Sequence, residues 1–162
     1  MERMTRPAPS IYQRAARVRV GAPTAVLFQD DLGWLGRGMR GAAFNFRGRR
    51  CVLLDADLES WDLVHVLLHE CEHHRAEDLP ELMPDGSFRN VMARPHRLPE
   101  TEIEERAGSE LDRLIRAWSK RRPTSHPGRP EPVWAGLPGW KPSVAHAIDI
   151  LERYLEVQRC RN

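Results

Sequence analysis

One segment of this 162-residue chain places many ionisable side chains in an otherwise apolar setting. Residues 64–74 read VHVLLHECEHH, with four histidines and two glutamates. Within it, His69-Glu70-Cys71-Glu72-His73 has the pattern H-E-x-x-H, which on a helix puts two imidazoles on one face, one turn apart. The apolar run before the motif favours a largely buried helix. We expect it to span about residues 57–75, with Asp57 as its N-cap.

This spacing predicts metal chemistry. Two histidines four residues apart can bind one Zn²⁺, and Glu70 beside them can act as general base towards water without being a ligand. We therefore expect His69 and His73 as metal ligands, Glu70 as the catalytic residue and one Zn²⁺ per chain. Mn²⁺, Co²⁺ or Ni²⁺ would also suit such ligands. A surface helix with solvated histidines is the alternative, and the apolar residues before the motif disfavour it.

A catalytic zinc site needs a third protein ligand. A metzincin would carry glycine at position 76 and histidine at position 79, but this chain has Ala76 and Leu79. A glutamate from a later helix, expected at about residues 101–120, is the remaining common choice. Glu104 is the best candidate, because apolar or small residues fall within about 60° of it in helical projection: Ala107, Gly108, Leu111, Ile115 and Trp118.

Two alternatives to Glu104 as ligand stay open. Thr101 to Glu104 fits the capping-box pattern T-x-x-E, in which Glu104 would bond to the backbone at the start of the helix. Glu105 would replace Glu104 as ligand if the helix were rotated. His65 and Asp62 share the His69 face and are candidates for orienting a metal ligand or stabilising an oxyanion. For His65, simple packing or solvent contact is the more usual explanation, whereas a helix-dipole role explains Asp62 equally well.

The rest of the chain suits one α+β domain over residues 1–162. We expect a flexible N-terminal segment and a short helix within residues 1–20, a strand at 24–28, and a hairpin of residues 42–46 and 51–54. Residues 76–100 should form an irregular loop with a turn at Asp85-Gly86. Residues 121–142 hold six of the thirteen prolines and should form a loop before a C-terminal helix at about 143–158.

Composition limits the partners and the compartment. A net charge of +2 does not favour nucleic acid, and Arg47, Arg49 and Arg50 in the expected hairpin turn resemble an ordinary solvated charge run. We therefore do not expect direct nucleic-acid binding. We see no signal peptide and no membrane-spanning segment. The odd number of widely spaced cysteines (Cys51, Cys71 and Cys160) predicts reduced thiols and a cytoplasmic protein.

Residues 41–118 resemble the ImmA/IrrE family of zinc metallopeptidases. The similar segments are AAFNFRGRRCVLL, DADLESWDL, HECEH and an E-x-x-A pattern at Glu104 to Ala107. Family members usually have Asn or Asp directly after E-x-x-A, where this chain has Gly108. The resemblance implies a compact zincin-like fold, with His69, His73 and Glu104 as ligands and Glu70 as base. It also implies a helix-turn-helix repressor as protein substrate. Family members are commonly encoded near mobile elements or stress regulons, so the resemblance suggests a regulatory role of that kind.

The leading hypothesis is thus a zinc metallopeptidase that hydrolyses a peptide bond in a protein partner. The competing hypothesis is a zincin-fold module that binds a protein or nucleic acid with little hydrolysis. A structural zinc protein or a metal-free helical protein is the third. Glu70→Gln separates the first two, because it should abolish cleavage and leave metal and partner binding intact.

Overall fold

The computed structural model describes residues 5–8, 10–58, 60–89 and 98–121. Residues 122–162 lie outside this part, and with them nearly all of the expected proline-rich loop and the whole expected C-terminal helix. Within the described part, helices and a mixed sheet are combined, which confirms the predicted α+β class.

The sheet has six strands in the order β1-β2-β4-β3-β5-β6. The central strands are β2 (Thr24–Gln29), β4 (Arg49–Asp55) and β3 (Gly41–Phe46). β2 and β4 run parallel, whereas β3 and β4 form an antiparallel hairpin. Short strands complete the two sides: β1 (Thr5–Pro7) beside β2, and β5 (Glu81–Leu82) and β6 (Phe88–Arg89) beyond β3.

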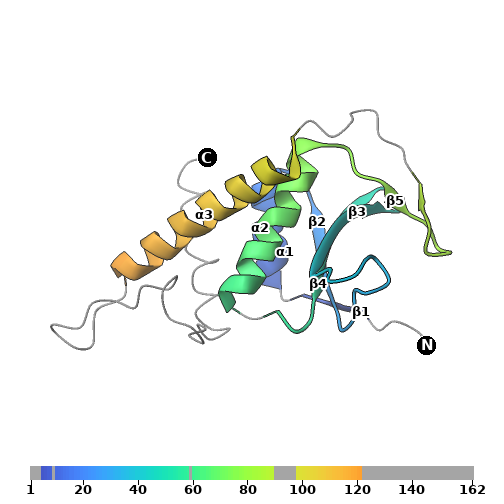
Figure 1. Ribbon diagram of the computed structural model, residues 1–162, viewed down its shortest axis with the longest axis horizontal. Helices are drawn as coiled ribbons and strands as arrows, with labels where there is room; N and C mark the ends of the chain where they lie inside the picture. Colours follow the sequence, from blue (N-terminus) through green and yellow to red (C-terminus); the bar gives the residue numbers. More distant parts are fainter. Residues whose placement is uncertain (1–4, 9, 59, 90–97, 122–162) are drawn as a thin grey trace.

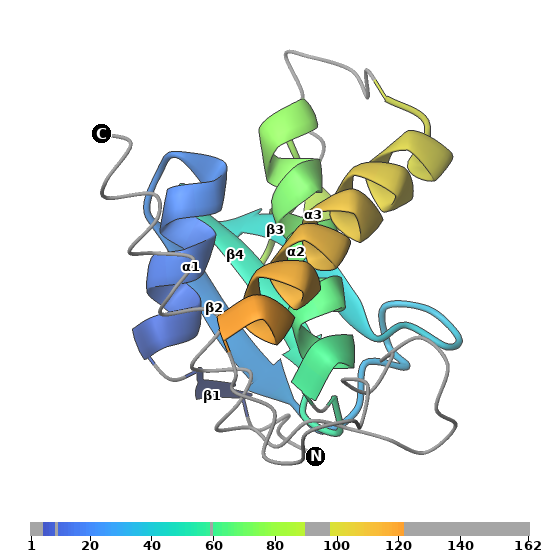
Figure 2. The ribbon, with the colours of Figure 1, turned by 90° about the vertical axis from the view of Figure 1, so that its left-hand side faces the viewer.

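Three helices lie on one side of this sheet (Figures 1 and 2). α1 (Ser10–Val20) packs on β2, and α2 (Ser60–Ala76) packs on β3 and β4. α3 (Glu100–Arg121) packs against α2 from the side away from the sheet. The helix that carries the H-E-x-x-H motif therefore lies between the sheet and a third layer.

Apolar clusters occupy both sides of α2. Between the helices and the sheet lie buried Tyr12, Val26 and Leu67, among others. Between α2 and α3 lie Trp61, Val64, Leu68, Ala107 and Leu114. A third cluster covers the opposite face of the sheet and includes Leu32, Phe44 and Leu53. Burial on two sides confirms that the motif helix is largely buried, and it fixes the direction of the remaining polar face.

Several predicted elements are confirmed. The strand at 24–28, the hairpin and the helix after residue 100 are all present. Arg47 and Gly48 connect the hairpin strands with φ angles of 50° and 75°, as a two-residue primed turn requires. The expected short N-terminal helix is α1, and the Asp85-Gly86 turn joins β5 to β6.

Other predictions were wrong in detail. α2 begins at Ser60, because Asp55 holds residues 57 and 58 in a turn: its carboxylate accepts a hydrogen bond from the Asp57 N–H and its carbonyl accepts one from Leu58. The segment expected to be an irregular loop contains β5 and β6. β1 was not expected at all, and such two- or three-residue strands carry no readable alternation.

Candidate metal centre

The two motif histidines lie side by side on the polar face of α2. Their ring centroids are 5.0 Å apart, and each side chain is 16% exposed. The opposite faces of the helix are buried by Val64, Leu67 and Leu68. Packing on two sides thus forces His69 and His73 towards the one open direction.

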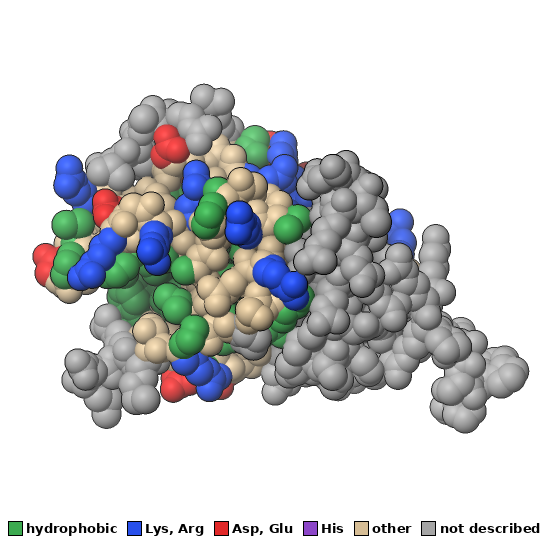
Figure 3. All heavy atoms as spheres, turned by 180° about the vertical axis from the view of Figure 1, so that it is seen from behind, with side chains coloured by type: hydrophobic (Ala, Val, Ile, Leu, Met, Phe, Trp, Pro, Cys, Tyr) green, Lys and Arg blue, Asp and Glu red, His purple; other side chains and the backbone are tan. Residues whose placement is uncertain are grey.

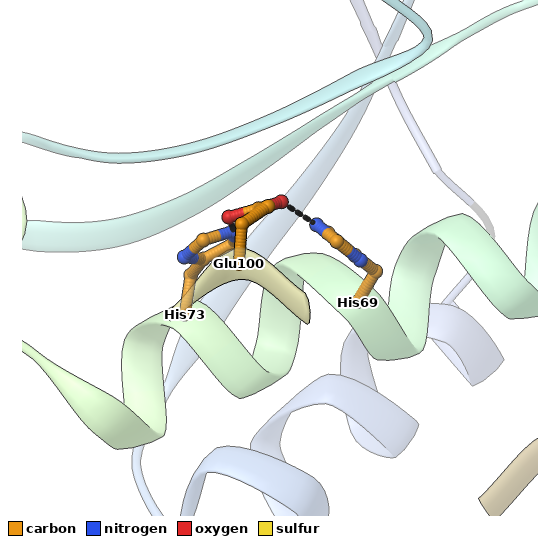
Figure 4. A group of neighbouring side chains, drawn as sticks. All are labelled: His69, His73 and Glu100. Carbon is orange, nitrogen blue, oxygen red and sulfur yellow. Dashed lines mark hydrogen bonds and ion pairs between the residues drawn. The ribbon is translucent and has the colours of Figure 1, made fainter. Parts of the chain in front are cut away.

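Glu100, in the first turn of α3, reaches both rings (Figure 4). Its Oε1 lies 2.7 Å from Nε2 of His69, and its Oε2 lies 3.2 Å from Nε2 of His73. One ligand atom from each of the three residues can be chosen so that all lie within 4.8 Å of one another. Among the described residues this is the one group of histidine, cysteine and carboxylate side chains that meets this criterion.

The other nitrogen of each ring also faces a carboxylate. Nδ1 of His69 lies 2.5 Å from Oε2 of Glu104, and Nδ1 of His73 lies 3.0 Å from Oε1 of Glu77. An imidazole that donates its Nδ1–H to a carboxylate keeps the Nε2 lone pair for a metal ion. Both rings are therefore held with Nε2 directed at the same point, near Glu100.

Glu104 lies in a different place from the one we expected. It does not sit at the centre of a buried stripe, because its side chain is 52% exposed. Among residues 100–116 of α3, the buried ones are Ile103, Ala107 and Leu114. Measured from Ala107 in helical projection, Glu100 is about 20° away and Glu104 about 60° away. Glu104 therefore lies on the flank of the stripe, one turn beyond Glu100, and meets the far side of the His69 ring.

Neither alternative for this helix gains support. The capping box requires Thr101 as N-cap, but Thr101 lies inside α3, where the carbonyl of Pro99 accepts hydrogen bonds from Glu102 and Ile103. Glu105 is exposed and projects about 160° from Ala107, away from α2. The sequence singled out this helix but not Glu100, because the direction of its side chain depends on which residues of α3 pack against α2.

His65 and Asp62 occupy different environments. Nε2 of His65 lies 2.8 Å from Oε1 of Glu104, so this carboxylate is shared by His65 and His69, although the His65 contact is not aligned as a hydrogen bond. Asp62 is exposed in the first turn of α2. Its predicted place beside a ligand histidine is taken by glutamates at all four ring nitrogens of His69 and His73.

Glu70 is buried beneath the histidines, with 8% of its surface exposed. Burial raises the pKa of its carboxyl to about 7; His69 and His73 lower it, and Glu100 and Glu104 raise it further. Gly41 of β3 lies directly against it: a Cβ there would be 2.5 Å from Val66 and 3.2 Å from Oε1 of Glu70. Only glycine lets this strand approach the motif helix so closely.

Charges and hydrogen bonds within the cluster also shift the pKa values of His73 and Glu100. Burial would lower the pKa of His73, but the hydrogen bond to Glu77 and nearby carboxylates, including Glu70 and Glu100, raise it overall. Burial would raise the pKa of Glu100, but the charges and hydrogen bonds of His73 and His69 lower it. Imidazole rings and carboxylates are therefore paired with one another throughout the site.

A cavity of about 560 Å³ lies over this cluster. Its walls come from α2, from the first turns of α3 and from residues 38–43, at the start of β3. His65, His69, Glu70, His73, Glu77, Glu100 and Glu104 all line it. Every site residue predicted from the sequence except Asp62 therefore faces this single cavity.

On another side of the motif helix, an ion-pair network joins the three helices. Glu72 is 1% exposed and bonds to Arg19 of α1 and to Arg75. Arg19 also lies 3.7 Å from Glu110 of α3. Cys71, beside it, is buried, and burial raises the pKa of its thiol to about 12. These motif residues therefore bind helices together and do not face the cavity.

Compared with known proteins, the chain matches no family model, no curated protein and no solved structure. Among the described residues, no helix has the length and apolar character needed to cross a membrane. What the site can do must therefore be argued from its own geometry.

Proposed function

We propose that this chain is a zinc-dependent metallopeptidase that hydrolyses a peptide bond in a protein partner. The observation that carries the proposal is the meeting of His69, His73 and Glu100 at one point, above the buried carboxyl of Glu70. Two imidazole nitrogens and one carboxylate form the donor set of many catalytic zinc sites. A catalytic zinc site needs a third ligand besides the two histidines of H-E-x-x-H, and here α3 places a carboxylate beside them.

We infer that Glu100 is the third ligand and that Glu104 orients His69. Glu100 faces both Nε2 atoms, whereas Glu104 faces the Nδ1 atom of His69 alone. This assignment changes how the ImmA/IrrE pattern aligns, and Ile103 then stands where the E-x-x-A pattern has alanine. If Glu100 begins the family's pattern, then Glu104 stands four residues later, where that family has Asn or Asp. On this assignment the compact α+β arrangement is a zincin-like domain.

The fit to zinc rests on the ring orientations. His69 and His73 each have a carboxylate on Nδ1, so a neutral ring presents an Nε2 lone pair towards Glu100. When bound there, zinc would supply a positive charge that polarises a carbonyl group and makes a nearby water more acidic. Glu104 and Glu77 would keep both rings from turning.

Glu70 is the proposed general base and acid. It accepts a proton from the attacking water and then transfers that proton to the nitrogen of the leaving amine, so protons balance over the reaction. Its burial suits this role, because a carboxyl whose pKa lies near neutrality can both accept and release a proton. Gly41 keeps the wall of the cavity close to Glu70 and excludes a side chain there.

The free edge of β3 supplies a place for an extended peptide. Asp55 donates a hydrogen bond to the Arg40 carbonyl, and Asn45 donates one to Pro80 on the opposite side. By alternation, the backbone groups of Gly41 and Ala43 point away from β4 and into the cavity. No described strand pairs with β3 at these two residues. A substrate could add there as a further strand.

Metal retention tests the ligand assignment. We would measure zinc per chain, and the zinc dissociation constant by chelator competition, for wild type and for three variants: Glu100→Ala, Glu104→Ala and Glu105→Ala. One zinc should be retained by wild type and by Glu105→Ala, held more weakly by Glu104→Ala and lost by Glu100→Ala. Loss confined to Glu104→Ala would restore Glu104 as ligand. If the folded wild-type protein took up no zinc, the proposal would be wrong.

Hydrolysis requires a separate measurement. Zinc-loaded wild type and Glu70→Gln would each be incubated with a mixed peptide library, and new peptide termini identified by mass spectrometry. We expect new termini with wild type alone, and equal zinc content in both proteins. A candidate helix-turn-helix repressor, the substrate class suggested by the family resemblance, can be tested in the same pair. Binding of that repressor without cleavage by either protein would favour the binding-module alternative.

A further inference from the structure

The small net charge conceals a strong separation of charge along the chain. Residues 5–55, which form α1 and β1 to β4, contain nine arginines and three aspartates. Residues 56–116 contain fifteen acidic residues and seven arginines. The metal centre draws its glutamates from this second part. The first part is therefore free to present an almost purely basic surface.

The fold brings four of these arginines towards one end of the sheet, and a fifth lies one turn further back in α1. Arg47, Arg49 and Arg50 lie at the hairpin turn and the start of β4. Arg50 pairs with Thr24, the first residue of β2, which follows the end of α1 after a three-residue connection. Arg17 lies in the last turn of α1, and Arg14 lies one turn before it. We call Arg14, Arg17, Arg47, Arg49 and Arg50 the arginine surface.

These side chains are exposed and form no ion pairs among the described residues. Arg50 has acidic neighbours, since it lines a cavity of about 240 Å³ with Glu77, Asp78 and Glu81. Seen from behind, the described part shows basic side chains spread over its surface, with fewer acidic ones, mostly near the rim (Figure 3).

Two details point to phosphate groups as the ligand. Every basic residue of this surface is an arginine, whose planar guanidinium can bind phosphate oxygens in pairs. The guanidinium of Arg47 lies 5.2 Å from the centroid of the half-buried Phe46 ring, so a cation and an aromatic face stand together at the hairpin turn. The turn carries no acidic residue to repel a polyanion.

We propose that the arginine surface binds the phosphate backbone of duplex DNA without sequence preference. Such binding is driven by release of counterions, so it needs locally clustered cations and not a large net charge. The glutamates of α3 would be repelled by the same duplex, which orients the metal centre away from it. This proposal does not depend on peptidase activity, because it uses none of the residues that line the metal centre.

The test compares two double variants of equal charge. Arg47→Asn with Arg49→Gln neutralises the hairpin, and Asn suits the positive φ at residue 47. Arg106→Gln with Arg116→Gln neutralises two exposed arginines of α3 and serves as control. Full-length wild type and both variants would be titrated into a fluorescently labelled 20-base-pair duplex, with anisotropy read at several salt concentrations, and thermal unfolding would confirm the fold.

We expect wild type to bind at low salt with an affinity that falls steeply as salt rises. The hairpin variant should bind about tenfold more weakly, and its plot of log Kd against log salt should lose a slope of about 2, one unit per phosphate contact. The α3 variant should change by less than about twofold. Equal weakening in both variants, or no binding by wild type, would overturn the proposal. So would equal competition by polyglutamate and by DNA of matched charge, since the ligand would then be an acidic polypeptide.

Discussion

Nδ1 of His73 lies 3.0 Å from Oε1 of Glu77, four residues later and just beyond the end of α2, and only 8% of Glu77 is exposed. His69 has the corresponding contact with Glu104, which is half-exposed and comes from another helix. The two rings are therefore oriented by carboxylates of very different exposure. The buried one lies just beyond the end of α2, where the Glu77 N–H donates a hydrogen bond to the His73 carbonyl.

Glu77 should accordingly control metal affinity. We expect Glu77→Ala to weaken zinc binding about 10- to 100-fold, because His73 loses the acceptor that sets its tautomer and orientation. Glu77→Gln keeps an acceptor oxygen and should recover most of that loss. Chelator competition measures both, with Glu105→Gln as control. Equal affinity in Glu77→Ala and wild type would show that packing alone orients the ring.

The metal-free protein should lose stability with rising pH through Glu70. Its carboxyl has a pKa of about 7 in the folded state because burial disfavours the charge, against 4.5 in the unfolded state. The folded state thus binds the proton more tightly, and this contribution is complete below pH 4.5 and declines until about pH 7. Relative to Glu70→Gln, wild type should lose about 3 kcal/mol across that range in urea unfolding. A constant difference between the two proteins would contradict the buried carboxyl.

Gly41 should tolerate no side chain. A Cβ at this position would lie 2.5 Å from Cγ1 of Val66, so Gly41→Ala should cost about 1–3 kcal/mol of unfolding free energy. The added Val66→Ala should recover part of it by removing the clashing methyl. Gly108→Ala is the control, because nothing lies within 4 Å of its Cβ position and alanine favours the helix interior by about 1 kcal/mol. Similar effects at both glycines would argue against the close approach of β3 to α2.

The ion pair of Arg19 with Glu72 should matter more than that of Arg75. Glu72 is almost fully buried, so Arg19→Met leaves a buried carboxylate without its main partner and should cost about 3 kcal/mol. Arg75 is 41% exposed, and Arg75→Met should cost less than about 1 kcal/mol. Chemical unfolding measures both. The double variant Arg19→Met with Glu72→Met should cost less than Arg19→Met alone, since no unpaired charge remains.

The sequence was sufficient for whatever depends on local spacing. The i,i+4 histidines, the glutamate beside them and the hairpin around Arg47-Gly48 follow from periods of 3.6 and 2 residues. The choice between Glu100 and Glu104 did not follow, because it depends on the rotation of α3 about its axis. That rotation is set by Ile103, Ala107 and Leu114, which pack on α2, and not by Gly108, which we had counted as part of the apolar stripe.

Contacts between distant segments were also beyond reach. Glu77 continues the i,i+4 series from His73, so its spacing was visible, but its burial was not. His74 next to the motif is buried, with Nε2 2.8 Å from the Cys51 carbonyl, a contact that requires the sheet to be in place. The arginine surface was likewise hidden by summing charge over the whole chain.

The packing of α3 has a consequence for how the site comes together. Its apolar face rests on α2 through one cluster, and the same helix supplies both Glu100 and Glu104. The donor set is therefore complete only when α3 is docked on α2. A cation bound by Glu100 and the two histidines would link the two helices and stabilise the docked state. Occupancy would then be readable far from the metal, in the slowed amide exchange of α3 along its whole length.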